Sequence, residues 1–272
     1  MSIAVQVVCL ILILLLGLFV FKRYPFQYKL RSTILVSLFL VLALVLSYFS
    51  MMLGLFGFPT LKIGLAQLPL MLVGVVFGPG YAFIAGILYD VLGLIVTPTN
   101  FPFLGFTLSN ILVCTIPALW LKESMKIKES ALKKVLPTIF FTIAMCFIIY
   151  LWTYTFSDTF TTSVMKLDNM QRLMITVGIP VYTLLLYFVV NKVIKRITSI
   201  NQTMVYQWVI AVLLVEIIAN LLLTPYWLYT MYGVPYILNF FVRVLKLMIM
   251  IPLNSIIGIT VWKVIRKLYR SS

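Results

Sequence analysis

The sequence predicts an all-α integral membrane protein. Of its 272 residues, 63% are hydrophobic and only 10% are charged, and the mean hydropathy is +1.15. A soluble globule has no interior large enough for so much apolar surface, so the excess has to face lipid. The apolar runs are long enough for helices, and they lack the short alternating segments that are typical of an outer-membrane barrel.

Apolar runs between clusters of charge divide the chain into nine expected membrane spans. Their approximate ranges are 1–21, 32–53, 65–78, 80–97, 103–121, 135–156, 173–190, 207–228 and 237–262. The first run carries no charge and ends without a small-residue cleavage site, so we interpret it as a membrane helix rather than a cleaved signal peptide. The third run is too short to cross a bilayer alone, and the stretch Phe77–Gly80, Phe-Gly-Pro-Gly, predicts a turn that joins it to the fourth.

Lysine and arginine residues predict the orientation of the spans. Most of the 21 basic residues fall in four clusters, at 22–31, 122–134, 192–196 and 263–270. Nine alternating spans place all four clusters on one side, which the positive-inside rule makes cytoplasmic. The N-terminus is then expected outside and the C-terminus inside. Topology and anionic lipid account for the net charge of +15, so we expect no nucleic-acid partner.

The reactive side chains argue against an enzyme. Cys9, Cys114 and Cys146 lie far apart inside apolar runs, without the spacing of metal ligands. The chain has no histidine, and its six acids are scattered. These features exclude a histidine-dependent nucleophile triad and a histidine-ligated metal, and no paired-carboxylate motif is present. We therefore expect no catalysis and no cofactor.

Motifs follow one another in a distinctive order between Leu61 and Asn110. The stretch reads LKIGLAQLPLMLVGVVFGPGYAFIAGILYDVLGLIVTPTNFPFLGFTLSN. A basic residue with Ile-Gly precedes Leu-Pro, Phe-Gly-Pro, a glycine-rich run ending in Asp-Val-Leu-Gly, a Phe-Pro loop and Gly-Phe-Thr-Leu-Ser. This order and spacing resemble the folate-type S component, the substrate-binding membrane subunit of energy-coupling factor (ECF) vitamin transporters. A second block, from Asn220 through Lys246 to Pro252, resembles the last two helices of that family.

The resemblance implies a six-helix core with three additional helices. The first four core helices occupy 32–121, and the last two core helices with a basic tail occupy 207–272. An extra helix and a basic loop precede them at 1–31, and a basic connector with an inserted helix pair lies at 122–206. The resemblance itself covers 32–121 and 207–265.

The resemblance also implies a function. An S component captures a vitamin outside the cell and delivers it inward with a membrane-spanning coupling subunit and two cytoplasmic ATPases, so we expect a bacterial plasma-membrane protein that binds folate or a related pterin. This chain has no phosphate-binding loop of its own. Thr224-Pro225 and Leu247 depart from the family pattern, which has Asn-Thr and Asn there. A different vitamin or micronutrient, or a non-transporting membrane assembly protein, therefore stays open as an alternative.

Folates present a flat ring and a tail with two carboxylates, so their site requires aromatic faces, polar partners for the ring and a cation for the tail. The expected substrate-binding residues are Lys62, Gln67, Asp90, Asn100, Phe103, Asn220, Trp227, Arg243 and Lys246. Arg243 and Lys246 share one face of the last span and form the expected anion-binding pair. The alternatives are snorkelling to the membrane surface or pairing with Asp90 and Glu216.

Each of the other candidates also has a structural alternative. Lys62 contacts an anionic tail or is an ordinary loop lysine, and Trp227 stacks on a ring or belongs to an aromatic belt. Asn100 and Phe103 belong to an outer loop that either gates the site or only connects two helices. The amides of Gln67 and Asn220, like the Asp90 carboxylate, bond the ligand or bond neighbouring helices.

A pair of small residues predicts the docking surface. Ala43 and Ser47 are four apart in the second span, a small-xxx-small spacing that permits close helix approach. The resemblance implies that this pair contacts the coupling subunit.

Overall fold

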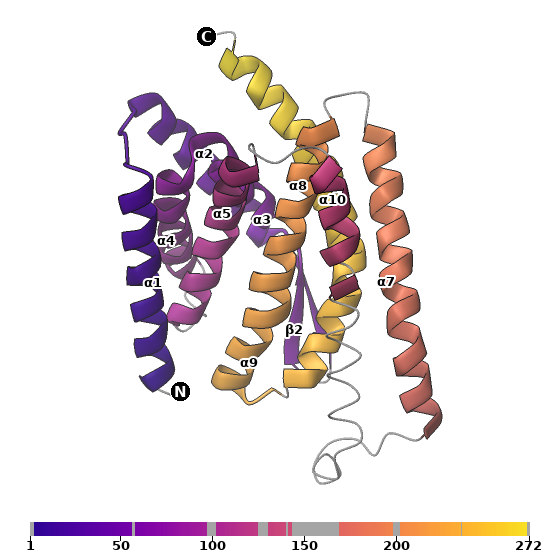
Figure 1. The fold of residues 1–272 in the computed structure, drawn as a ribbon. Helices are drawn as coiled ribbons and strands as arrows, with labels where there is room; N and C mark the ends of the chain where they lie inside the picture. The colour runs from indigo at the N-terminus through magenta and orange to yellow at the C-terminus, as the bar shows by residue number, and fades with distance from the viewer. Residues whose placement is uncertain are drawn as a thin grey trace. The chain divides into compact units, whose positions relative to one another are not determined.

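The computed structural model describes residues 3–55, 58–96, 102–124, 130–139, 141–142, 169–197, 202–234 and 236–270. Figure 1 labels the helices and strands that are named below. The chain divides into two compact units. Unit 1 comprises Met1–Lys126 and Gln207–Ser272, and unit 2 comprises Ile127–Tyr206. All candidate site residues belong to unit 1, which is therefore described first.

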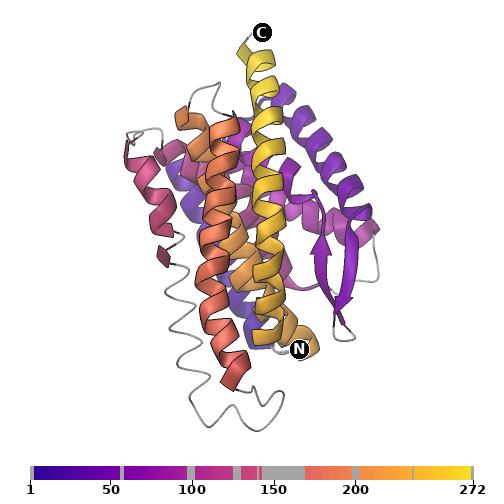
Figure 2. The ribbon, with the colours of Figure 1, turned by 90° about the vertical axis from the view of Figure 1, so that its right-hand side faces the viewer.

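The first part of unit 1 follows the predicted order of helices, with one addition. Its elements are α1 (Ile3–Arg23), α2 (Leu30–Tyr48), β1 (Met51–Leu55), β2 (Phe58–Ile63), α3 (Gln67–Phe77), α4 (Pro79–Val96) and α5 (Leu104–Ser124). The expectation that the second span continues to residue 53 was wrong, because the helix ends at Tyr48 and an antiparallel hairpin follows. Gly54, Gly57 and Pro59 interrupt the apolar run here, and these residues disfavour a helix interior. Strand β2 packs on α10 (Tyr236–Arg270), as Figure 2 shows.

Helix α3 is a half-length helix. Its 11 residues span about 16 Å at 1.5 Å per residue, roughly half of the ~30 Å hydrocarbon core. It ends at Gly78, whose φ of 90° is readily available only to glycine, and Pro79 begins α4. The predicted turn between the third and fourth runs is therefore confirmed.

Helix α5 lies against α3, α4 and α1 at the centre of this part of the fold. Two glycines allow α3 and α4 to approach α5 closely. A Cβ on Gly74 of α3 would collide with the carbonyl of Cys114, and a Cβ on Gly86 of α4 would collide with the backbone of Ile111. Cys9 and Cys114 are free and buried, as expected for small hydrophobic side chains.

The second part of unit 1 consists of one long helical run and α10. The run contains α8 (Gln202–Val215), which belongs to unit 1 from Gln207 onward, the π-helix η2 (Glu216–Leu223) and α9 (Thr224–Tyr232). It ends at Gly233, which adopts the left-handed conformation of a helix C-cap. Helix α10 packs on η2, α9 and α3.

Unit 2 contains helix α7 (Asn169–Ile197), with Pro180 in its interior, and helical residues 130–139. Helix α7 contains the seventh expected span. Most of the sixth expected span, 135–156, lies outside the described residues.

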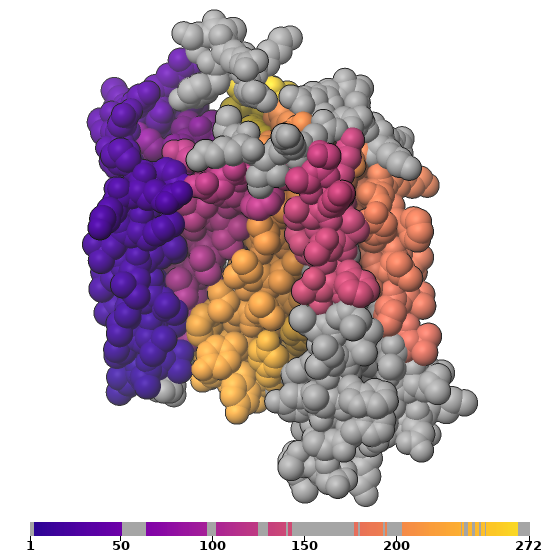
Figure 3. All heavy atoms as spheres, in the orientation of Figure 1, coloured from indigo at the N-terminus to yellow at the C-terminus, as the bar shows by residue number. Residues whose placement is uncertain are grey.

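The composition of the helices bears out an all-α, multi-pass membrane protein. Within the described residues, five helices are long and apolar enough to cross a bilayer: Ile3–Arg23, Leu30–Tyr48, Pro79–Val96, Leu104–Ser124 and Thr203–Tyr232. Large apolar side chains of α1, including Leu14, Leu18 and Phe19, are exposed. In Figure 3, α1 forms the indigo surface at the left. In a membrane protein such a face contacts lipid.

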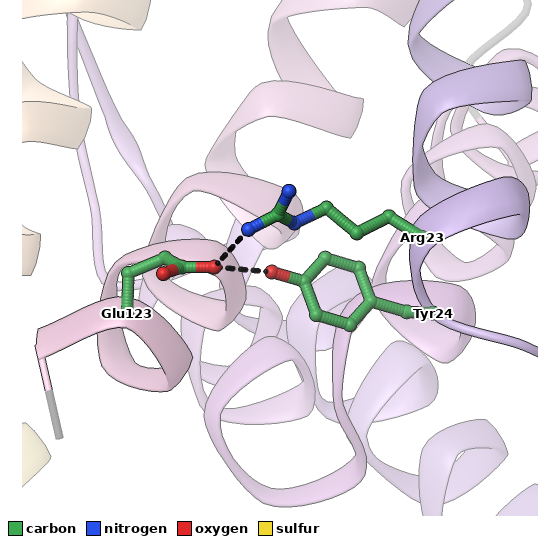
Figure 4. A network of polar contacts seen from close by, with 3 residues as sticks. All are labelled: Arg23, Tyr24 and Glu123. Atoms are coloured by element: carbon green, nitrogen blue, oxygen red, sulfur yellow. Dashed lines mark hydrogen bonds and ion pairs between the residues drawn. The ribbon is translucent and has the colours of Figure 1, made fainter. Parts of the chain in front are cut away.

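The ends of α1 and α5 meet in a polar network. One carboxylate oxygen of Glu123 accepts hydrogen bonds from Arg23 Nη2 at 3.0 Å and from the Tyr24 hydroxyl at 2.9 Å (Figure 4). The Lys122 ammonium lies 4.4 Å from the centre of the Tyr24 ring. The basic clusters after the first and fifth spans thus lie on the same side, as their charges predict.

Candidate functional site

A cluster of polar side chains is buried where α3, η2 and α10 meet. We call it the polar cluster. The half-buried Gln67 and the buried Glu216, Asn220, Arg243 and Asn254 are joined by hydrogen bonds, and we include the buried Asn239 and Lys246, which by their spacing lie on the same face of α10 as Arg243. Glu216 is 0% exposed, and Arg243 and Lys246 are 6% and 7% exposed. Ionisable groups in membrane segments are rare because their burial is costly, so a buried cluster of them marks a candidate functional site.

Hydrogen bonds join the three helices through three amides and one carboxylate. The amides of Gln67 and Asn220 form a reciprocal pair, with N···O distances of 2.9 and 2.8 Å. One oxygen of Glu216 accepts from Asn220 Nδ2 at 2.8 Å, and the other accepts from Asn254 Nδ2 at 3.1 Å. Glu216 is therefore held from both its own helix and α10.

The π-helix explains how Arg243 joins this cluster. The N–H of Thr224 donates to the carbonyl of Ala219, five residues back, and Pro225 has no N–H to donate. The carbonyl of Asn220 thus lacks its usual donors from within the helix, and Arg243 Nη1 donates to it from α10 at 3.4 Å. An irregular helix of this kind is often found at functional sites.

The polar residues of α10 form one stripe along the helix. Asn239, Arg243 and Lys246 are spaced by four and three residues, which places them on a common face. At 1.5 Å per residue, Arg243 and Lys246 lie about 10 and 15 Å from the first residue of α10. Both side chains are buried, so snorkelling to the membrane surface does not describe this conformation.

Asn239 has unused hydrogen-bonding capacity. Its side chain is 0% exposed, and within the described residues neither Oδ1 nor Nδ2 has a hydrogen-bond partner. Buried amides are normally paired, because an unpaired one costs ~1–3 kcal/mol. An orphan amide one turn from Arg243 therefore indicates a position where a ligand group is expected.

The N-terminus of α3 adds to the positive potential. The helix starts at Gln67, beside Asn220, and no side chain caps it. A helix start carries a partial positive charge, and half-helices that start within the membrane are a recurrent device for holding anionic substrates.

Asp90 lies outside the polar cluster. Its two oxygens accept hydrogen bonds from Thr107 Oγ1 at 2.6 Å and from Asn110 Nδ2 at 2.9 Å, both on α5. Of the two roles expected for Asp90, the structure shows the bond between helices. Thr107 belongs to the Gly-Phe-Thr-Leu-Ser motif after the Phe-Pro loop, and Asn110 follows that motif directly, so the motif and the acid are joined in the structure.

Trp227 and Phe103 form a separate, buried aromatic cluster. Their ring centres are 5.6 Å apart in an edge-on arrangement, and the indole N–H of Trp227 donates to Ser109 Oγ at 2.9 Å. Both rings pack against a core that includes Cys9 and Ile13 of α1. In this conformation they contribute to the helix core rather than to an open stacking surface.

A comparison with protein families identifies the family of the chain. A family model described as the ECF transporter substrate-specific component matches residues 31–205. The chain belongs to this family. A comparison of the chain with curated proteins gave no match. The family match includes residues 122–205 of the predicted segment 122–206, and it stops before the last two expected core helices.

Two expected residues of this S component are not described at the level of side chains. Lys62 lies in β2, opposite Met52 of β1, which places its backbone in the hairpin. Asn100 lies outside the described residues.

The expected docking pair lies on the inner side of α2. Ala43 is 0% exposed, Ser47 is half-buried, and they continue a stripe that includes the buried Val36 and Leu40. Helix α2 packs on α3 and α4. In this conformation Ala43 is part of the bundle interior.

Asn239 and Asn254 were missed as site residues from the sequence. Their spacing could have indicated that they lie with Arg243 and Lys246, because residues 239, 243, 246 and 254 recur at helical intervals along one face of the last span. Amides are common in any polar sequence, and only burial shows which of them belong to the cluster.

Proposed function

We propose that this S component binds a vitamin, folate or a related pterin, at the polar cluster between α3, η2 and α10. It takes the vitamin from outside the cell and, with a membrane-spanning coupling subunit and two cytoplasmic ATPases, delivers it inward across the plasma membrane. The observation that carries the proposal is the burial of Arg243 and Lys246 on one face of α10, beside an unpaired amide.

The chemistry of the cluster suits such a ligand. Two cations attract a carboxylate, and Arg243 offers the forked donors that bind one well. Asn239, Asn220 and Gln67 present amide donors and acceptors of the kind that the polar edge of a pterin requires.

Direct identification of the bound molecule tests the proposal. The full chain is purified in detergent, and any small molecule it carries is extracted and identified by mass spectrometry. Isothermal titration calorimetry with folate, pteroate and other vitamins then gives affinities. Binding of a different vitamin would leave the transport role standing and overturn the pterin, whereas the absence of any vitamin binding would overturn the transport role.

Arg243→Ala tests the site itself. If Arg243 meets a ligand carboxylate, its removal weakens binding at least tenfold, or about 1.4 kcal/mol. Lys29→Ala is the matched control, because Lys29 is exposed outside the cluster. An unchanged affinity in a folded Arg243→Ala protein would place the ligand elsewhere.

Co-purification tests the partners. Expression in a cell that supplies the coupling subunit and the ATPases is expected to yield a complex in which vitamin uptake depends on ATP. A chain that binds no vitamin and recruits no ATPase would instead fit a non-transporting membrane assembly protein.

A further inference from the structure

The amides of the polar cluster differ in how many of their hydrogen-bonding groups are already used. Asn220 uses both N–H groups of its amide, on Gln67 Oε1 and on Glu216, each at 2.8 Å. Gln67 donates to Asn220 Oδ1 at 2.9 Å, and Asn254 donates to Glu216 at 3.1 Å. Three of the four amides described in the cluster therefore hold helices together, and a ligand can use only the groups that these bonds leave.

Asn239 is the fourth amide, and its groups are unused. The side chain is 0% exposed, and among the described residues neither Oδ1 nor Nδ2 has a hydrogen-bond partner. Bulk water does not reach a side chain buried to this degree, and an unpaired buried amide destabilises the fold. In Asn254, by contrast, only Oδ1 is unpaired. Asn239 thus offers a ligand both a donor and an acceptor without breaking a bond between helices.

Asn239 lies near the outer end of α10. It follows Tyr236, the first residue of the helix, by three residues, which is about 4.5 Å along the axis. The basic residues at 263–270 predict that the opposite end of the helix is cytoplasmic. Arg243 lies one turn further in on the same face. A vitamin that arrives from outside therefore reaches the level of Asn239 before that of Arg243.

We propose that Asn239 is the residue by which this S component recognises a neutral amide-like group of its substrate, such as a lactam, a ureide or a primary amide. Such a group has an N–H beside a C=O, and it pairs with an asparagine amide through two parallel hydrogen bonds. The inference rests on the proposed function and specifies its substrate class. The lactam of a pterin and the ureide of biotin belong to this class. An analogue that lacks the N–H leaves the Asn239 carbonyl unpaired and is bound less tightly.

The stability of Asn239→Leu tests whether the amide has a structural role. Leucine branches at the same carbon as asparagine but has no polar atoms. In the protein without vitamin, the change removes an unpaired buried amide, so differential scanning fluorimetry is expected to show a Tm that is about 2–4 °C higher. Asn254→Leu is the matched control on the same helix, and its Tm is expected to fall because Glu216 loses a donor. An equal fall in Asn239→Leu would reveal a structural partner, such as an ordered water, and would overturn the inference.

Methylated ligands test the contact itself, because an N-methyl group removes the N–H that the Asn239 carbonyl would accept. The probe pairs are folate with 3-methylfolate and biotin with its ureide N-methyl derivative. In a pair that binds the purified full chain, calorimetry is expected to show the methylated partner binding at least tenfold more weakly. In Asn239→Leu, the parent vitamin is expected to bind at least tenfold more weakly than to wild type, and the two partners are expected to differ less than threefold. Such a joint loss identifies a direct contact.

The outcomes separate this inference from the proposed function. If Asn239→Leu keeps the wild-type preference for the unmethylated partner, the inference is overturned and the proposed function stands. The same holds if the vitamin that the wild-type chain binds most tightly has no amide-like group, because vitamin transport would remain. Failure of every vitamin to bind the wild-type chain would overturn both.

Asn239→Ala provides a second variant in case Asn239→Leu fails to fold. Alanine is smaller than asparagine, so it introduces no collision in the buried cluster, and it also removes both polar atoms. The preference for the unmethylated partner is expected to fall below threefold, as in Asn239→Leu. Retention of a tenfold preference in Asn239→Ala would overturn the inference.

Discussion

Arg243 of α10 donates a hydrogen bond to the backbone carbonyl of Asn220 in the π-helix, at a distance of 3.4 Å. This contact exists because Pro225 lacks the N–H that would otherwise complete the helix, and because the N–H of Thr224 goes to Ala219. Pro225 thus leaves the Asn220 carbonyl available to accept a hydrogen bond from the buried guanidinium of Arg243.

Pro225→Ala is expected to weaken vitamin binding without lowering the thermal stability of the protein. The restored N–H completes the helix and stabilises it, but it also favours a regular α-helix, which rotates Glu216 and Asn220 away from their partners. Calorimetry measures the affinity, and differential scanning fluorimetry measures Tm. Pro180→Ala in α7 is the control, because it removes a helix-interior proline from the other unit. If Pro225→Ala bound the vitamin with wild-type affinity, the π-helix would not be required for binding.

The reciprocal amide pair predicts non-additive stability. Gln67→Leu leaves Asn220 without one of its partners, and a buried amide that loses a partner costs ~1–3 kcal/mol. Replacing both residues with leucine is expected to cost less than the sum of the two single changes. Thermal unfolding of the two single variants and the double variant measures this coupling. Strict additivity would show that the pair contributes no joint stability.

Ser109→Ala is expected to destabilise the aromatic cluster. It leaves the buried indole N–H of Trp227 without its acceptor, at a cost of ~1–3 kcal/mol. Vitamin affinity is expected to stay within threefold of wild type, because the indole is not in the polar cluster. A loss of affinity with unchanged Tm would instead assign Trp227 to the ligand.

Two glycines of α4 provide a matched pair. Gly86→Ala places a Cβ against the backbone of Ile111, and such overpacking costs about 1–3 kcal/mol. Gly93→Ala places the same Cβ where no atom lies within 4 Å, so it is expected to be neutral or stabilising. A comparison of the two Tm values checks the packing of α4 on α5. Equal effects would contradict the close crossing at Gly86.

Much of the fold was predictable because its signals are local. The apolar runs predicted α1, α4, α5 and α7, and the turn at Gly78 follows from the properties of glycine and proline. The hairpin after Tyr48 was missed, because a short apolar run does not by itself distinguish a strand from a helix.

The candidate site was predictable only in part. Arg243, Lys246, Asn220 and Gln67 were identified as polar residues in apolar segments, and three of them are joined by hydrogen bonds. Asp90 lies apart from them because its partners come from α5, and Trp227 is held by Ser109. Which polar groups face one another depends on helix rotation, which the spacing of residues within one helix does not specify.

The sequence by itself determined that this protein crosses the membrane as a bundle of helices, since hydropathy and charge act residue by residue. Its motifs also indicated the family to which it belongs. Only the tertiary structure decided that Glu216, on the π-helix, shares a buried hydrogen-bonded cluster with Asn220 of the same helix and with Arg243 and Asn254 of α10. The physical reason is that burial and hydrogen-bond pairing are properties of side chains brought together from distant segments.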